Sequence, residues 1–117
     1  MKLYGVRIWV QDYDAARCFY AETLGLPLAW DMPEAGAFGV DVGATLIVER
    51  ADSTDAESAA LVGRFVGVSL QVEDIQETWH RLGELGVPFD GPPETQPWGG
   101  TLAHFRDPSG NVLTLLG

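Results

Sequence analysis

An internal repeat limits the folds that this chain can adopt. Residues 5–12 read Gly-Val-Arg-Ile-Trp-Val-Gln-Asp, and residues 67–74, about 60 positions later, read Gly-Val-Ser-Leu-Gln-Val-Glu-Asp. In both copies apolar residues alternate with other residues, which is the period of a β-strand with two different faces. Each copy ends in an aspartate, Asp12 or Asp74, a residue type that caps the N-terminus of a helix. The repeat therefore predicts two modules that each begin with a strand and a helix.

Both predicted helices end at a glycine. The glycines lie in Leu24-Gly25-Leu26-Pro27 and Leu85-Gly86-Val87-Pro88, and a left-handed glycine followed by proline is a common helix end. Residues with helical spacing mark the face that each helix turns to the core. They are Ala16, Phe19, Tyr20 and Thr23 in the first copy, and Ile75, Trp79, Leu82 and Leu85 in the second.

Short strands follow each helix. We expect them at residues 26–31, 36–41 and 44–50, and again at residues 87–90, 101–106 and 111–116. The small, polar and acidic residues 51–60 predict a solvated linker with some helical character. The expected fold is α+β, with two tandem βαβββ modules in one domain that spans residues 1–117. Module one covers about 1–50, the linker about 51–62 and module two about 63–117.

The charge of the chain excludes some classes of partner. The formal net charge is −10, from 17 acidic against 7 basic residues, and such a surface repels phosphate backbones and anionic lipids. We expect no nucleic-acid and no membrane partner. The negative charge also favours a cationic ligand. Cys18 is the only cysteine, so no intramolecular disulfide forms. Because no signal-like or membrane-spanning apolar run is visible, we expect a cytoplasmic protein.

The order of these motifs resembles a known family. Phe19-Tyr20 and Leu24-Gly25 in the first copy, with Phe105-Arg106-Asp107-Pro108-Ser109-Gly110-Asn111 near the C-terminus, are similar to the vicinal oxygen chelate superfamily. That superfamily contains glyoxalases, bleomycin-resistance proteins and extradiol dioxygenases. The resemblance implies that the sheets curl into a cup with the helices outside. It also implies that small molecules bind in the cup, often near a dimer interface, so we expect a homodimer.

The resemblance further implies four positions for metal ligands, on the first and last strands of each module. In this chain they fall on Gly5, Glu49, Gly67 and Thr114. Only Glu49 has a side chain typical of a metal ligand, and glycine offers no side chain at all. The departure removes the Lewis acid on which the family's enzymes depend. We therefore expect no metal and no other cofactor.

Strand alternation predicts which side chains line the cup, because residues of one parity share one face. The expected lining is Arg7, Trp9, Ser69, Gln71, Thr114 with Val112, and Glu49 with Ile47 and Thr45. Aromatic, charged and neutral hydrogen-bonding groups in this mixture are typical of a small-molecule pocket. The alternative is that Arg7 and Glu49 form a structural ion pair and that Trp9 only fills space.

Two further residues are candidates for the site. Trp98 lies in the turn-rich loop Gln96-Pro97-Trp98-Gly99-Gly100, where it could cover a bound ligand or anchor the loop to the core. His104, on the strand before the Asp-Pro turn, is a general base if it points into the cup, and a structural residue otherwise. Trp30 and Trp79 are expected in the core.

The favoured function is a metal-free binding protein that sequesters an aromatic compound such as an antibiotic. The negative charge of the chain favours a cationic compound. The alternative is a lyase, isomerase or dioxygenase of the same superfamily. Such an enzyme would use a non-standard metal site with Glu49 and His104, or metal-free acid–base chemistry with both residues and Arg7. A third possibility is a sensor or partner-binding module with an empty cup.

Overall fold

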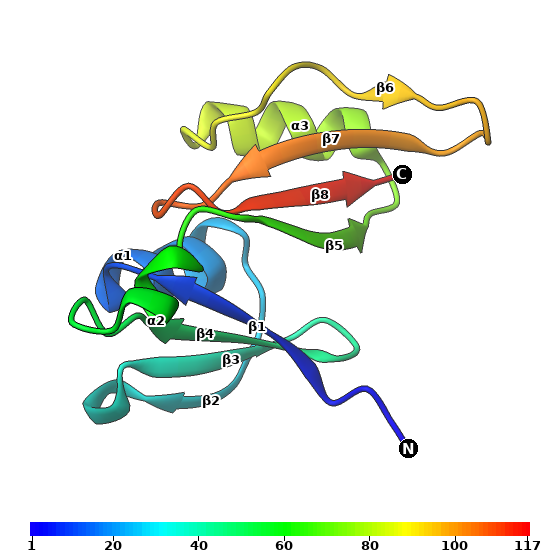
Figure 1. Ribbon diagram of the computed structural model, residues 1–117. Helices are drawn as coiled ribbons and strands as arrows, with labels where there is room; N and C mark the ends of the chain where they lie inside the picture. Colours follow the sequence, from blue (N-terminus) through cyan, green and yellow to red (C-terminus); the bar gives the residue numbers. More distant parts are fainter.

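The repeat builds two four-stranded sheets in the computed structural model, which describes residues 1–117 (Figure 1). The first half contains β1 (Gly5–Val10), α1 (Tyr13–Arg17), the π-helical turn η1 (Cys18–Thr23), β2 (Leu28–Met32), the 3-10 turn η2 (Pro33–Ala35), β3 (Ala37–Asp41) and β4 (Thr45–Arg50). The second half contains α2 (Ala56–Ala60), β5 (Phe65–Gln71), α3 (Ile75–Glu84), β6 (Glu94–Thr95), β7 (Thr101–Arg106) and β8 (Val112–Leu116).

The two sheets have the same topology. Their strand orders are β1-β4-β3-β2 and β5-β8-β7-β6. In each sheet the first strand pairs in parallel with the last strand of its module, and the other neighbours are antiparallel. This arrangement confirms the α+β fold with two βαβββ modules. The curled sheets remain unclosed within the chain.

The helix ends follow the sequence signals. Asp12 accepts a hydrogen bond from the backbone N–H of Ala15 at 3.0 Å, and Asp74 accepts one from Glu77 at 3.1 Å. Gly25 and Gly86 adopt φ angles of 68° and 90°, the left-handed conformation that ends a helix. The expected helical turn in the linker is α2, which Asp55 caps.

Two predicted elements differ from the structure. No strand forms at residues 87–90, where Phe89 makes only an isolated bridge to Phe105, and the short strand β6 lies at 94–95 instead. Prolines 88, 92 and 93 interrupt this segment, and a proline lacks the N–H that a sheet ladder needs. The first helix is also not a continuous α-helix, because it widens into a π-helical turn after Arg17.

One hydrophobic core serves both modules. The η1 residues Phe19 and Tyr20 connect it, since Phe19 packs on Phe105 of β7 while Tyr20 packs on Phe38 of β3. The expectation that Trp30 and Trp79 belong to this core is wrong, because both side chains are only half-buried. Leu85, also expected on the buried face of the helix, is 59% exposed.

A buried polar network joins the modules at one end of β1. Asp107 accepts a hydrogen bond from the Tyr20 hydroxyl at 2.8 Å, and Asn111 donates to the carbonyl oxygen of Trp9 at 2.8 Å. Asn111 Oδ1 also accepts from the backbone N–H of Gly63 at 2.9 Å. At the other end β1 and β5 diverge (Figure 1). Residues of both modules line a mainly apolar cavity of about 640 Å³ between them.

No helix has the length and apolar character to cross a membrane.

Candidate functional site

The candidate site lies on the faces of the two sheets that point away from the helices. On β1, Ile8 and Val10 are buried towards the helices, while Arg7 and Trp9 project to the opposite side. We call this opposite side the open face. Its residues are Arg7, Trp9, Trp30, Thr45, Ile47 and Glu49 in the first sheet, and Phe65, Ser69, Gln71, His104, Val112 and Thr114 in the second.

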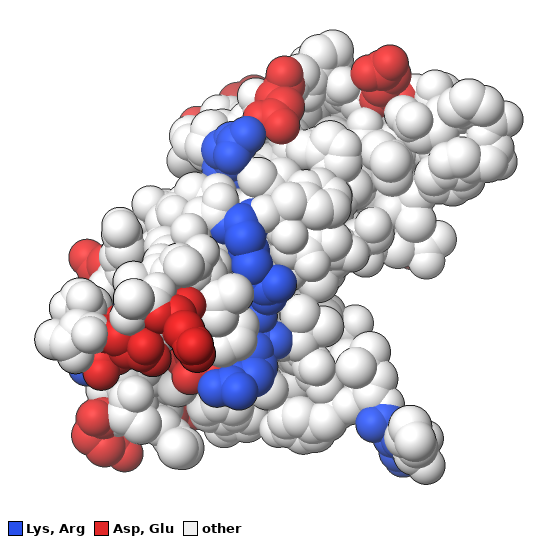
Figure 2. Space-filling view, in the orientation of Figure 1, with Lys and Arg blue, Asp and Glu red and all other residues white.

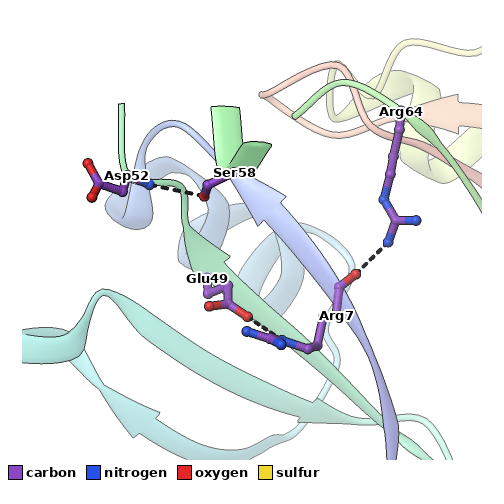
Figure 3. Close-up of polar contacts among 5 residues, drawn as sticks. All are labelled: Arg7, Glu49, Asp52, Ser58 and Arg64. Carbon is purple, nitrogen blue, oxygen red and sulfur yellow. Dashed lines mark hydrogen bonds and ion pairs between the residues drawn. The ribbon is translucent and has the colours of Figure 1, made fainter. Parts of the chain in front are cut away.

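The centre of the open face holds a cluster of charged side chains around the indole ring of Trp9. Figure 3 shows the charged members, Arg7, Glu49 and Arg64. Arg7 Nε lies 2.6 Å from Glu49 Oε1, and this hydrogen-bonded carboxylate raises the pKa of the Arg7 guanidinium. The guanidinium carbons of Arg7 and Arg64 lie 5.0 and 5.7 Å from the centre of the Trp9 ring. Arg64 also donates from Nη2 to the carbonyl oxygen of Arg7 at 2.6 Å. The ion pair foreseen as an alternative therefore exists, within a larger cluster.

The second sheet contributes a histidine and an exposed aromatic ring. His104 Nδ1 is hydrogen-bonded to Thr114 Oγ1 at 2.8 Å, and Thr114 is buried. The Phe65 ring stands edge-on to the imidazole, with centroids 6.0 Å apart, and this residue is 62% exposed. Ser69 and Gln71 lie on exposed positions of β5 and border the cavity between the modules. His104 thus lies on the open face, held by a hydroxyl rather than a carboxylate.

Trp98 lies at the tip of the β6–β7 hairpin, which projects from the second sheet (Figure 1). The loop is closed by a hydrogen bond from the N–H of Gln96 to the carbonyl oxygen of Gly100 at 2.7 Å. The indole rests on Gly100, where a Cβ atom would meet the ring at 2.0 Å, and Trp98 is 66% exposed. The alternative that Trp98 anchors the loop to the core is therefore wrong, and its role over a ligand stays a prediction.

Sequence reasoning missed three residues at this site: Trp30, Arg64 and Phe65. Trp30 covers Gly39, at which a Cβ atom would lie 2.7 Å from the ring, and its Nε1 donates to the Tyr4 hydroxyl at 3.1 Å. A signal for Trp30 existed, because glycine opposite a large ring on a neighbouring strand leaves room for it. Arg64 precedes β5, so the alternation of a strand could not place its side chain.

The residues at the four family ligand positions do not fit a metal ion. A Cβ atom on Gly5 would lie 2.2 Å from the carbonyl oxygen of Thr45, and Gly67 has a φ of 79°, which side chains rarely adopt. Glu49 is bound to Arg7, and Thr114 to His104. No group of three or more His, Cys, Asp and Glu residues is placed to hold a metal ion. The backbone itself thus requires the glycines that replace the ligands.

Comparison with known proteins gives a consistent family. The model of the Glyoxalase/Bleomycin resistance protein/Dioxygenase superfamily matches residues 3–115. The chain is 33% identical to the Bacillus subtilis (strain 168) protein YraH, over 98% of this chain and 97% of that one. A superfamily member from Sphaerobacter thermophilus DSM 20745 has 32% identity and a TM-score of 0.82, covering 99% and 96% of the chains. TnmS3, an antibiotic binding protein from Streptomyces sp. CB03234, has 32% identity and a TM-score of 0.77, covering 98% and 93%.

Proposed function

The chain belongs to the Glyoxalase/Bleomycin resistance protein/Dioxygenase superfamily, and from this premise we propose that its open face binds a small aromatic compound, such as an antibiotic, without a metal ion. The likeness to the antibiotic binding protein TnmS3 over nearly the whole chain supports this proposal. We propose that the ligand contacts are made by Arg7, Trp9, Glu49, Ser69, Gln71, Trp98, His104 and Thr114, the residues expected from the sequence, with Trp30 added.

The observation that carries the proposal is the composition of the open face. Trp9, Trp30 and Phe65 present aromatic surface beside guanidinium, imidazole and hydroxyl groups. Aromatic area that remains uncovered next to a few fixed polar groups is typical of small-molecule sites. The glycines at positions 5 and 67 favour binding over metal-dependent chemistry, since neither position can carry a ligand side chain without moving the backbone.

Enzymatic chemistry without a metal is a second candidate because of one observation. Thr114 holds the imidazole of His104 in place on the open face, where the ring could accept a proton from a bound compound. Glu49 is a weaker candidate for a proton acceptor, because one of its carboxylate oxygens is bound to Arg7. Mass spectrometry of a bound compound after incubation separates the candidates: an unchanged compound supports sequestration, and a His104-dependent product supports catalysis.

The binding proposal is tested by titrating the protein with aromatic antibiotics and aromatic metabolites in the presence of a strong chelator. We expect at least one compound to quench tryptophan fluorescence and to raise the melting temperature despite the chelator. The quenching should fall in Trp9→Phe and persist in Trp79→Phe, a matched control on α3. Binding that appears only when a divalent metal is restored would contradict the metal-free proposal.

A further inference from the structure

We propose that the open face holds its aromatic ligand through an anionic group, a carboxylate or phenolate, which Arg64 binds beside Trp9. The inference rests on the proposed function, because it names the chemical class of the compound bound there. Its starting point is that Arg64 has no carboxylate within ion-pair distance. Four other arginines each have such a partner: Arg7, Arg17, Arg81 and Arg106. Arg50 also lacks one, but it is exposed and lies outside the cluster.

The Arg64 guanidinium has donors without acceptors. A guanidinium carries five N–H bonds in a planar fork. In Arg64, Nη2 donates to the carbonyl oxygen of Arg7, Nε is buried without a hydrogen-bond partner, and Nη1 has no acceptor in the protein. Because Nε is covered by the protein, Nη1 is the group through which an arriving anion binds this half-buried cation. Hydrogen bonds between charged groups are the strongest kind available.

The balance of charge around Trp9 also favours an anion. The cluster holds two guanidiniums, of Arg7 and Arg64, against the single carboxylate of Glu49, which leaves one positive charge in surplus. Glu49 is neutralised by Arg7, so it is not a free counter-ion for a cationic ligand. Asp52 does not restore the balance, since its carboxylate points away from the arginines and bonds to Thr54 (Figure 3).

The acidity of the whole chain does not outweigh this local surplus. Charges on an exposed surface are largely screened beyond about 8 Å at physiological ionic strength. Figure 2 shows a band of basic side chains across the middle of this side of the molecule, in the region where Figure 3 places Arg7 and Arg64. In the same view the largest group of acidic side chains lies at the lower left, beside the lower part of this band, and others lie near the top. The charges that lie over Trp9 are therefore those of Arg7 and Arg64, although the net charge of the chain is −10.

Trp9 has a specific part in this arrangement. Both guanidiniums lie over its ring, and a planar guanidinium stacks on an indole while its edge remains free to bind a carboxylate. Trp9 thus holds the cations in position, and a flat acid can accept hydrogen bonds from Arg64 while its ring covers Ile47, the partner of Arg7 on the neighbouring strand β4. The ligand class that fits is an aromatic acid.

The test uses three probes of one shape: 2-naphthoate, the neutral 2-naphthamide and the cationic 2-naphthylmethylammonium. Dissociation constants are measured by NMR titration with the full chain. We expect 2-naphthoate to bind about tenfold more tightly than either other probe, the usual size of a charge-assisted hydrogen bond. Arg64→Gln should abolish this preference, and Glu49→Gln, which frees Arg7, should strengthen it. Arg50→Gln is the matched control, since it removes an exposed arginine outside the cluster.

The outcomes separate this inference from the proposed function. If the amide or the ammonium probe binds as tightly as the carboxylate, or if Glu49→Gln weakens binding of the carboxylate, the inference is wrong while aromatic binding stands. If an equal loss of carboxylate binding follows Arg50→Gln and Arg64→Gln, general charge rather than Arg64 holds the ligand, and the inference is again wrong. If none of the three probes binds, aromatic binding at the open face is contradicted together with the inference.

Discussion

At the scale of single residues, Gly5 shows why the family's ligand position is empty of side chains. The parallel strand β4 comes so close that a Cβ atom on Gly5 would meet the carbonyl oxygen of Thr45 at 2.2 Å. This oxygen belongs to the backbone and cannot rotate away. The strand pair therefore excludes any residue larger than glycine unless it separates.

Replacing Gly5 by alanine should lower the free energy of unfolding by about 1–3 kcal/mol, the usual range for forcing atoms into a filled space. Gly83→Ala is the control, because Gly83 is an exposed residue within α3 with nothing near its Cβ position. It should gain up to about 1 kcal/mol from the better helix propensity of alanine. Urea unfolding measures both changes, and a Gly5→Ala protein as stable as the wild type would show that the strands do not approach so closely.

The sequence predicted some residues of the site better than others. Alternation along β1 and β4 correctly placed Arg7, Trp9 and Glu49 on one face, because the side-chain period of a strand is two. It could not reveal Arg64, which lies before its strand and reaches across to the other module. That Glu49 is neutralised depends on a side-chain geometry that no residue pattern encodes.

At the scale of the elements, a short polar chain fastens α1 to β2. Asp31 accepts hydrogen bonds from the Tyr13 hydroxyl and from Arg17 Nε, the latter at 2.7 Å. Burial, followed by the neighbouring carboxylate, raises the pKa of Tyr13 to about 12. The two donors in turn lower the pKa of Asp31 below its usual value.

These shifts predict how stability changes with pH. Unfolded Tyr13 loses its proton near pH 10, whereas the folded protein keeps it to about pH 12, so its contribution is complete below pH 10 and is lost as the pH rises between these values. Tyr13→Phe should flatten part of this alkaline loss, while Tyr4→Phe, at an exposed tyrosine, should not. Urea unfolding across this range measures the slope, and identical slopes in the wild type and Tyr13→Phe would refute the account.

The ends of the elements were predictable where a single residue decides them. Asp12, Asp74, Gly25 and Gly86 end or begin helices as expected, because capping depends on local chemistry. The π-helical turn η1 was not predictable from its spacing. Phe19 packs against β7 of the second sheet and Tyr20 packs against β3 of the first sheet. This packing between distant parts of the chain overrides the regular helix.

At the scale of the whole molecule, the unclosed sheets leave apolar surface exposed. Leu3, Tyr4, Met32 and Phe65 are among the large side chains that solvent reaches, and the two modules diverge around the cavity between them. Exposed patches of this kind are commonly covered by another protein surface. We therefore propose that two copies of the chain associate.

Light scattering at micromolar concentration should give a mass twice that of the chain. Phe65→Glu places a charge on the open face and should shift the protein towards the monomer. Leu85→Glu, at a similarly exposed leucine after α3, serves as the control and should leave the mass unchanged. A monomer mass for the wild type under these conditions would rule out the dimer.

The relation between the modules is what the sequence could least predict. The repeat predicts two similar units, but their junction depends on Tyr20 meeting Asp107, 87 residues away, and on Asn111 reaching the backbone of β1. The motif that contains Asp107 and Asn111 was recognisable as a turn, and its buried contacts appear only in three dimensions.

The most direct test of aromatic binding at the open face follows the indole N–H signals of the four tryptophans by NMR. The protein is labelled with nitrogen-15, treated with a chelator and saturated with 2-naphthoate. We predict that the signals of Trp9 and Trp30 move, because both rings lie on the open face, while that of Trp79 on α3 does not. Signals of Trp9 and Trp30 that remain fixed while the probe binds elsewhere would contradict the central claim.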